Sequence, residues 1–172
     1  MSNVSVSPGP SGPIAVRIAS ISQLFNSLDP FPFQERDLDK NAEEFIVGYL
    51  PKDKILFMSE AYLNRIFPAM RSAYPSDWVA TIEKAQAMDV SVFVPGHGFV
   101  DSPAVLKEEL ETFRKAIVQV IAEARRLREA GLDAQAAVAQ AKFGDLESWT
   151  LRASQGPIAI PRVFLELEGK LR

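Results

Sequence analysis

The chain contains a single histidine, and it stands at the end of a strongly β-prone run. Residues 90–94 have the sequence Val-Ser-Val-Phe-Val, which is typical of a buried strand. Pro95 and Gly96 end that strand, and His97 follows between two glycines. A turn of this kind presents a side chain where it can act as a metal ligand or as an acid/base group. The same residues also fit a plain turn without a chemical role, and this stretch alone leaves both interpretations open.

The composition limits the chemistry that His97 can join. The 172 residues suit one domain, or one small domain with an appendage, and 47% hydrophobic residues are enough for a real core. Because the chain has no cysteine, disulfides and thiolate metal sites are excluded. With one histidine, any metal site must use carboxylates or ligands from another chain. The net charge of −3 argues against nucleic acid as a partner.

The sequence predicts neither a membrane span nor a secretion signal. No apolar stretch has the length needed to cross a bilayer. The first residues lack a basic region followed by an apolar one. We therefore expect a cytoplasmic protein.

The first 44 residues divide into two segments. Residues 1–13 are rich in serine, proline and glycine, which predicts a flexible leader. Residues 14–44 form an N-terminal segment of unknown type. It begins with alternating apolar residues at Ile14, Val16 and Ile18, a pattern that favours a short strand.

Two features follow within that N-terminal segment. Residues 29–33, Asp-Pro-Phe-Pro-Phe, predict a packed loop or a docking segment, because two prolines fix the backbone. Further on, Asp37 and Asp39 belong to a group of carboxylates that could bind a metal ion. Carboxylates also favour the first turn of a solvated helix, so that both interpretations remain.

Residues 45–58 predict a β-hairpin. Two apolar, β-prone runs flank a turn, Pro-Lys-Asp-Lys, at 51–54. A helix over 38–49 fits the periodicity almost as well. Glu60 follows the second strand, where a carboxylate is well placed for a site, although an ordinary solvent-facing residue is the alternative.

The next segment predicts a loop and then a helix. Residues 61–74 are apolar, and Pro68 interrupts any helix there, which favours an irregular loop that is either part of the core or a binding surface. Ser76 is the expected N-cap of a helix that ends near Asp89. With the hairpin and the 90–94 strand, this helix completes a strand–helix–strand unit.

Three helices are expected in the remainder. Ser102 and Pro103 open a long one that ends at Gly131 and packs on the sheet. Asp133 caps a short alanine-rich helix, and the last helix follows the pair at 156–157. The apolar stripe of the long helix consists of Leu106, Leu110, Phe113, Ile117, Val120, Ile121, Ala124 and Leu127.

From about residue 45 to 171, this order of elements resembles the C-terminal half of a metallo-β-lactamase-fold hydrolase. The residues that carry the resemblance are Leu50-Pro51-Lys52-Asp53-Lys54-Ile55-Leu56-Phe57, Asp77-Trp78, Val94-Pro95-Gly96-His97-Gly98 and the helix at 161–167. The resemblance implies a layered α/β fold. Residues 45–172 would form half of an αββα sandwich, with the sheet covered by helices, and the N-terminal segment would be unrelated.

The resemblance also implies a partial metal site. In that family the histidine that matches His97 is a metal ligand, and the aspartate that aligns with Glu60 bridges two metal ions, zinc or alternatively iron or manganese. Ser59 stands where the family usually has glycine. The family's main motif, His-x-His-x-Asp-His, is absent, as is a further histidine before the hairpin. Two candidate ligands remain, whereas a catalytic zinc site uses three protein ligands and a water.

These observations lead to three functional hypotheses. The first is a metal-dependent hydrolase of this fold, or an incomplete member of the family, which would attack an ester, amide, thioester or phosphoester. The second is a non-catalytic interaction or oligomerisation module, because half of a sandwich leaves an apolar sheet face bare. The N-terminal segment, a second copy in a homodimer or a partner chain would cover that face. The third is a metal-free acid/base enzyme that uses His97 with Glu60.

Overall fold

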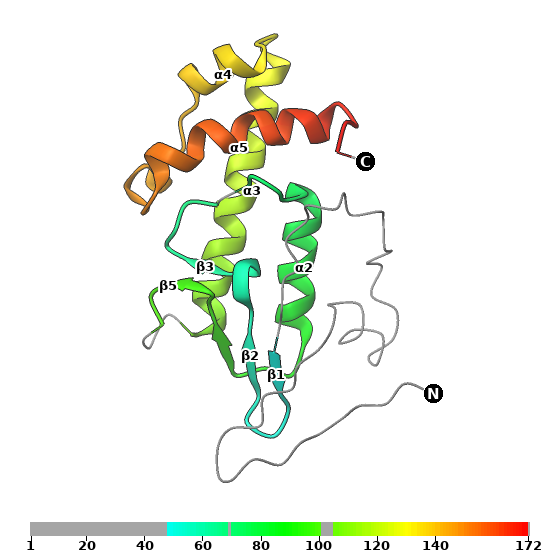
Figure 1. Cartoon of the computed structure of the whole chain (residues 1–172), viewed down its shortest axis with the longest axis vertical. Helices are drawn as coiled ribbons and strands as arrows, with labels where there is room; N and C mark the ends of the chain where they lie inside the picture. Colours follow the sequence, from blue (N-terminus) through cyan, green and yellow to red (C-terminus); the bar gives the residue numbers. More distant parts are fainter. Residues whose placement is uncertain (1–47, 69, 101–104, 172) are drawn as a thin grey trace.

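The computed structural model describes residues 48–68, 70–100 and 105–171, and these form a mixed α/β structure (Figure 1). The strands are β1 (Gly48–Leu50), β2 (Ile55–Phe57), β3 (Leu63–Asn64), β4 (Val92–Val94) and β5 (His97–Gly98). The helices are α2 (Pro75–Ala87), α3 (Lys107–Glu129), α4 (Ala134–Gln140) and α5 (Arg152–Leu167), with 3-10 turns η1 (Ser59–Ala61) and η2 (Gly144–Ser148). The expectations for the leader and the N-terminal segment lie outside the described residues.

Strands β1, β2 and β4 form one sheet in that order. The pair β1–β2 is antiparallel and the pair β2–β4 is parallel, so the predicted hairpin and the strand–helix–strand unit through α2 are both confirmed. The alternative of a helix reaching residue 49 is wrong, because Tyr49 pairs with Leu56 in the hairpin. Strands β3 and β5 form a second, parallel sheet in which Leu63 is opposite His97.

The three-stranded sheet has one buried face. Leu56 and Phe93 are neighbours across β2 and β4, and both are fully buried. They belong to the same hydrophobic core as Ile82 of α2 and Phe113 of α3. Helices α2 and α3 therefore cover this side of the sheet, as Figure 1 also shows.

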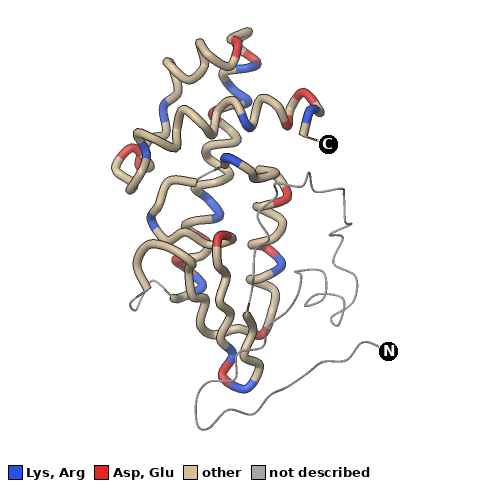
Figure 2. Tube along the Cα trace, viewed as in Figure 1, with Lys and Arg blue, Asp and Glu red and all other residues tan. Residues whose placement is uncertain are grey.

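The opposite face of this sheet, which we call the outer face, is apolar and only partly covered. Side chains of residues that pair across strands point to the same side. The register thus places six residues on the outer face: Gly48, Leu50, Ile55, Phe57, Val92 and Val94. None of them is buried, and Phe57 is 44% exposed. All three strands are free of charged residues, whereas the β1–β2 turn carries both signs (Figure 2).

The loop at 61–74 belongs to the core. Tyr62, Phe67 and Met70 have no solvent exposure, and Phe67 packs edge-on against Phe143 at 4.9 Å between ring centroids. Of the two interpretations that the sequence allowed, the structure confirms that the loop is part of the core.

The long helix α3 runs through both halves of the molecule (Figure 1). The sheets and α2 lie along its first half, and α4 and α5 lie against its second half. The predicted stripe from Leu110 to Leu127 is buried throughout. Leu106 is an exception: it is the N-cap residue and is 40% exposed, because the helix starts only at Lys107. Ser102 and Pro103, which we expected to open the helix, lie outside the described residues.

Two helices begin elsewhere than the sequence predicts. Helix α2 starts at Pro75, and Ser76 does not cap it through its own side chain. Helix α5 starts at Arg152, after Leu151 in the left-handed region at φ 63°, and not after the pair at 156–157. It includes Pro157 and Pro161. Buried residues on either side of these prolines, from Gly156 to Phe164, keep this part of the helix packed against the core. Gly131 at the end of α3 and the Asp133 cap of α4 are confirmed.

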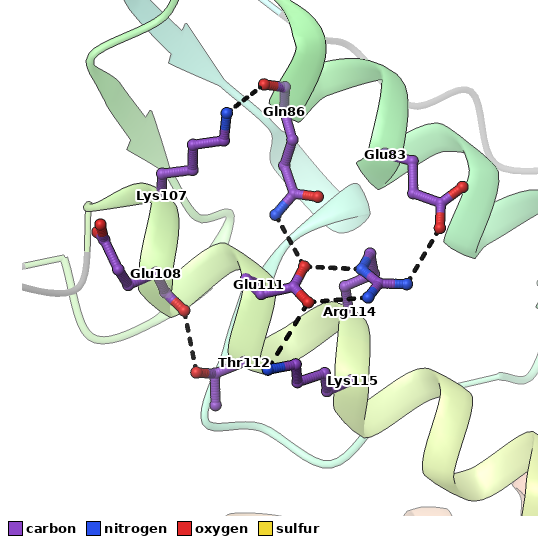
Figure 3. Close-up of polar contacts among 8 residues, drawn as sticks. All are labelled: Glu83, Gln86, Lys107, Glu108, Glu111, Thr112, Arg114 and Lys115. Atoms are coloured by element: carbon purple, nitrogen blue, oxygen red, sulfur yellow. Dashed lines mark hydrogen bonds and ion pairs between the residues drawn. The ribbon is translucent and has the colours of Figure 1, made fainter.

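A polar cluster fastens α2 to α3 (Figure 3). The Arg114 guanidinium donates two hydrogen bonds to the Glu111 carboxylate, at 2.7 and 2.8 Å, and a third to Glu83 at 3.0 Å. Gln86 donates to Glu111 at 3.1 Å, and Lys107 donates to the Gln86 carbonyl at 2.7 Å. The Arg114 hydrogen bonds lower the pKa of Glu111 from 4.5 to about 2.

No helix in the described ranges is both long enough and apolar enough to span a membrane.

Candidate functional site

The turn that carries His97 depends on both of its glycines. A Cβ atom on Gly96 would overlap the backbone of Ser59. Gly98 has a φ of +92°, and a Cβ there would overlap the carbonyl oxygen of Asn64. These close approaches require glycine at both positions. The Gly-His-Gly sequence is thus explained by two backbone contacts on either side of the histidine.

Backbone hydrogen bonds join this turn to the segment that carries Glu60. The Gly96 amide donates to the carbonyl oxygens of Ser59, at 3.1 Å, and of Tyr62, at 3.0 Å. The Met58 amide donates to the Val94 carbonyl at 2.9 Å. The ends of β2 and β4, and the residues directly after them, are therefore held side by side.

Glu60 and His97 meet at this edge. Nε2 of His97 and Oε1 of Glu60 are 2.5 Å apart, although the two residues are 37 positions apart in the sequence. Both side chains remain accessible, with 60% of His97 and 39% of Glu60 exposed. The structure thus brings together the two site residues that the sequence analysis singled out.

Ser59, directly before Glu60, has an unusual backbone conformation. Its φ is +46°, in the left-handed region that favours glycine. This is the position at which the resembled family usually has glycine. The backbone conformation that a glycine would adopt freely is present here with a serine.

Two further residues support the site, and sequence reasoning missed their roles. The Trp78 indole donates to the Ala61 carbonyl at 2.9 Å and so ties α2 to η1, the turn that holds Glu60. Asn64 is 2% exposed, and its amide donates to the Phe99 carbonyl at 3.3 Å, just beyond the His97 turn. The only available signal for Asn64 was a polar residue within an apolar loop.

Tyr62 lies beside the site but does not act in it as a base. It is fully buried, and burial raises the pKa of its hydroxyl above the ordinary value. The hydroxyl is therefore protonated at all physiological pH values. Its ring packs on Phe113 at 5.6 Å between centroids, which makes it a core residue.

The His97–Glu60 pair fits a metal ion by the chemistry of its donors. Imidazole nitrogen and carboxylate oxygen both bind zinc at about 2.0–2.2 Å, which sets two ligands of a tetrahedral ion roughly 3.4 Å apart. The two atoms would have to separate by about 1 Å, which small rotations of two exposed side chains allow.

Two donors are too few for a catalytic metal site. Among residues 48–68, 70–100 and 105–171, no group of three or more His, Asp or Glu side chains is placed to hold a metal ion. Asp37 and Asp39, the other carboxylates considered, lie outside these ranges. The described residues thus offer two adjacent, exposed donors that need further ligands to hold a catalytic ion.

Comparison with models of known protein families gave no match, and comparison with curated proteins gave none either. What the pair can do chemically is therefore inferred from its donor atoms, its exposure and its place at the ends of β2 and β4.

Proposed function

We propose that this chain is an incomplete member of the metallo-β-lactamase-fold hydrolases, with His97 and Glu60 as two of its metal ligands. One observation carries the proposal. The two residues that the resemblance assigns to metal binding come from distant parts of the sequence, and they meet within 2.5 Å at the ends of adjacent parallel strands. The sheet with helices on one face is consistent with half of an αββα sandwich.

Zinc, or alternatively iron or manganese, would supply a polarising charge and a nucleophilic hydroxide for ester, amide, thioester or phosphoester hydrolysis. This chain would contribute Nε2 of His97 and an oxygen of the Glu60 side chain. Hydrolysis by the chain would require further ligands, from residues outside the described ranges or from a second chain.

The test is metal binding by the purified 172-residue chain. We expect stoichiometric zinc by elemental analysis and a saturable titration by calorimetry. His97→Ala and Glu60→Ala should each weaken zinc binding at least tenfold. Glu129→Ala is the matched control, because Glu129 is an exposed carboxylate at the far end of α3. A chain that retains no zinc, iron or manganese would overturn the proposal.

A second function is favoured by the outer face. Six apolar positions in register, none of them buried, form a surface that other apolar groups can cover. A non-catalytic interaction or oligomerisation module would use this surface, with a second copy or a partner chain packed on it. Light scattering and hydrophobic-dye binding test this function. A monomer that binds no dye would count against it.

A further inference from the structure

The outer face ends at the His97–Glu60 pair. Phe57 is the last residue of β2 and Val94 is the last residue of β4, and both belong to the outer face. Glu60 follows Phe57 by three positions, and His97 follows Val94 by three. Beyond the turn, Phe99 and Val100 are 58% and 60% exposed. The outer face and the two donors thus meet at the same ends of β2 and β4.

The outer face alone is smaller than the surface that one partner buries in a standard interface. Three strands of three residues, spaced about 4.8 Å apart with a rise of about 3.3 Å per residue, present roughly 140 Å² of sheet. A standard interface buries about 800 Å² on each partner. A dimer of ordinary affinity that forms through this face therefore needs a further source of free energy.

A metal ion shared by two chains would be such a source, and His97 and Glu60 supply donor atoms for it. Each chain offers one imidazole nitrogen and one carboxylate oxygen, and both side chains are exposed enough to be reached by another molecule. Two copies would offer four donors, the number that a closed tetrahedral zinc site takes, and such a site joins chains and has no open position for a water. Two chains related by a two-fold axis would place identical donors around that axis.

The charge of Glu60 makes dimer formation depend on a metal ion. Two Glu60 carboxylates brought to one axis repel each other unless a cation lies between them. The outer face itself has no charged residue to oppose or to assist a second copy.

We propose that a zinc ion joins two copies of this chain, with His97 and Glu60 of each copy as its ligands and the two outer faces packed on each other. This inference rests on the proposed metal binding by His97 and Glu60. It commits the partner to a second copy of this chain, and it makes the association conditional on the metal.

The experiment is sedimentation velocity on the 172-residue chain, first in EDTA and then with increasing zinc, together with elemental analysis of the separated species. We expect a monomer in EDTA, and a dimer with one zinc per two chains that EDTA reverses. Magnesium, which prefers six oxygen ligands, should not replace zinc. His97→Ala and Glu60→Ala should stay monomeric at zinc concentrations that fully dimerise Glu129→Ala.

A variant on the outer face, with His97 and Glu60 unchanged, measures the contribution of the apolar contact apart from that of the zinc ligands. Phe57→Ser should raise the dissociation constant of the zinc-bound dimer by roughly tenfold, because it removes partly exposed apolar surface that the dimer would bury. Circular dichroism confirms that each variant is folded.

The outcomes distinguish this inference from the proposal on which it rests. One zinc per chain on a monomer would overturn the dimer and keep the metal ligands. No bound zinc would overturn both. An equal amount of dimer in EDTA and in zinc would overturn the metal link and support the interaction module.

Discussion

At the scale of single residues, the two glycines beside His97 have a testable role in stability. Gly98→Ala should lower the free energy of unfolding by about 1–3 kcal/mol, because the new Cβ would meet the Asn64 carbonyl at a positive φ. Gly131→Ala is the control, since Gly131 also has a positive φ, +81°, but nothing within 4 Å of the new atom. Urea unfolding measures both. Equal losses would show that the contact with Asn64 costs nothing.

The sequence was informative about residues that serve a local purpose. His97 stood out because a strand, a proline and two glycines surround it, and Glu60 because it follows a strand. The contribution of Asn64 could not be predicted, because its partner, the Phe99 carbonyl, is 35 residues away. Trp78 lies within the helix that the sequence predicts after Ser76, but its hydrogen bond to the Ala61 carbonyl forms only because α2 lies against η1.

At the scale of elements, helix boundaries were the part that local signals placed least well. Ser76 has the composition of an N-cap, yet its amide and its hydroxyl both donate to Glu166 of α5, each at 3.0 Å. A remote carboxylate thus satisfies the first turn of α2. In the same way, the start of α5 is set by its packing and by the turn at Leu151, and the prolines inside it are tolerated.

The contact between α2 and α5 gives a prediction at this scale. Glu166→Ala should destabilise the chain by about 0.5–2 kcal/mol, because the N-terminus of α2 loses its acceptor and a favourable negative charge. Glu168→Ala serves as the control, since Glu168 pairs with Lys170 beyond the end of α5. Thermal unfolding followed by circular dichroism compares the two. If both variants unfold at the same temperature, Glu166 does not cap α2.

The polar cluster between α2 and α3 predicts a dependence on pH. The pKa of Glu111 is about 2 in the folded chain, below the ordinary value of 4.5, because Arg114 donates hydrogen bonds to its carboxylate. The stabilisation is therefore complete above about pH 4.5 and is lost as the pH falls towards 2. Glu111→Gln should cost about 1 kcal/mol at pH 7 and clearly less at pH 3.

Urea unfolding at both pH values measures this difference, with Glu129→Gln as the control for a carboxylate in the same helix. A loss for Glu111→Gln that is the same at pH 7 and pH 3 would contradict the assignment of the stabilisation to the charged pair.

At the scale of the whole molecule, the sequence predicted how the strands and helices follow one another. It did not predict which groups cover the outer face of the sheet. The hairpin, the crossover through α2 and the buried stripe of α3 follow from local patterns of apolar residues, and the structure has all three. The sheet also has one face, the outer face, on which none of the six residues is buried. A group that covers this face must come from a distant part of the sequence or from another chain. A local sequence pattern therefore cannot identify it.

The two faces of the sheet should respond differently to the same substitution. Phe93→Ser should destabilise the chain by about 3–5 kcal/mol, because Phe93 is fully buried between the sheet and the helices. Phe57→Ser, on the adjacent strand but on the outer face, should cost less than about 1 kcal/mol and should lower the binding of a hydrophobic dye. Urea unfolding and dye fluorescence on the same samples measure the contrast. A Phe57→Ser loss as large as that of Phe93→Ser would mean that the outer face is already packed within the chain, which would leave no surface for a second copy.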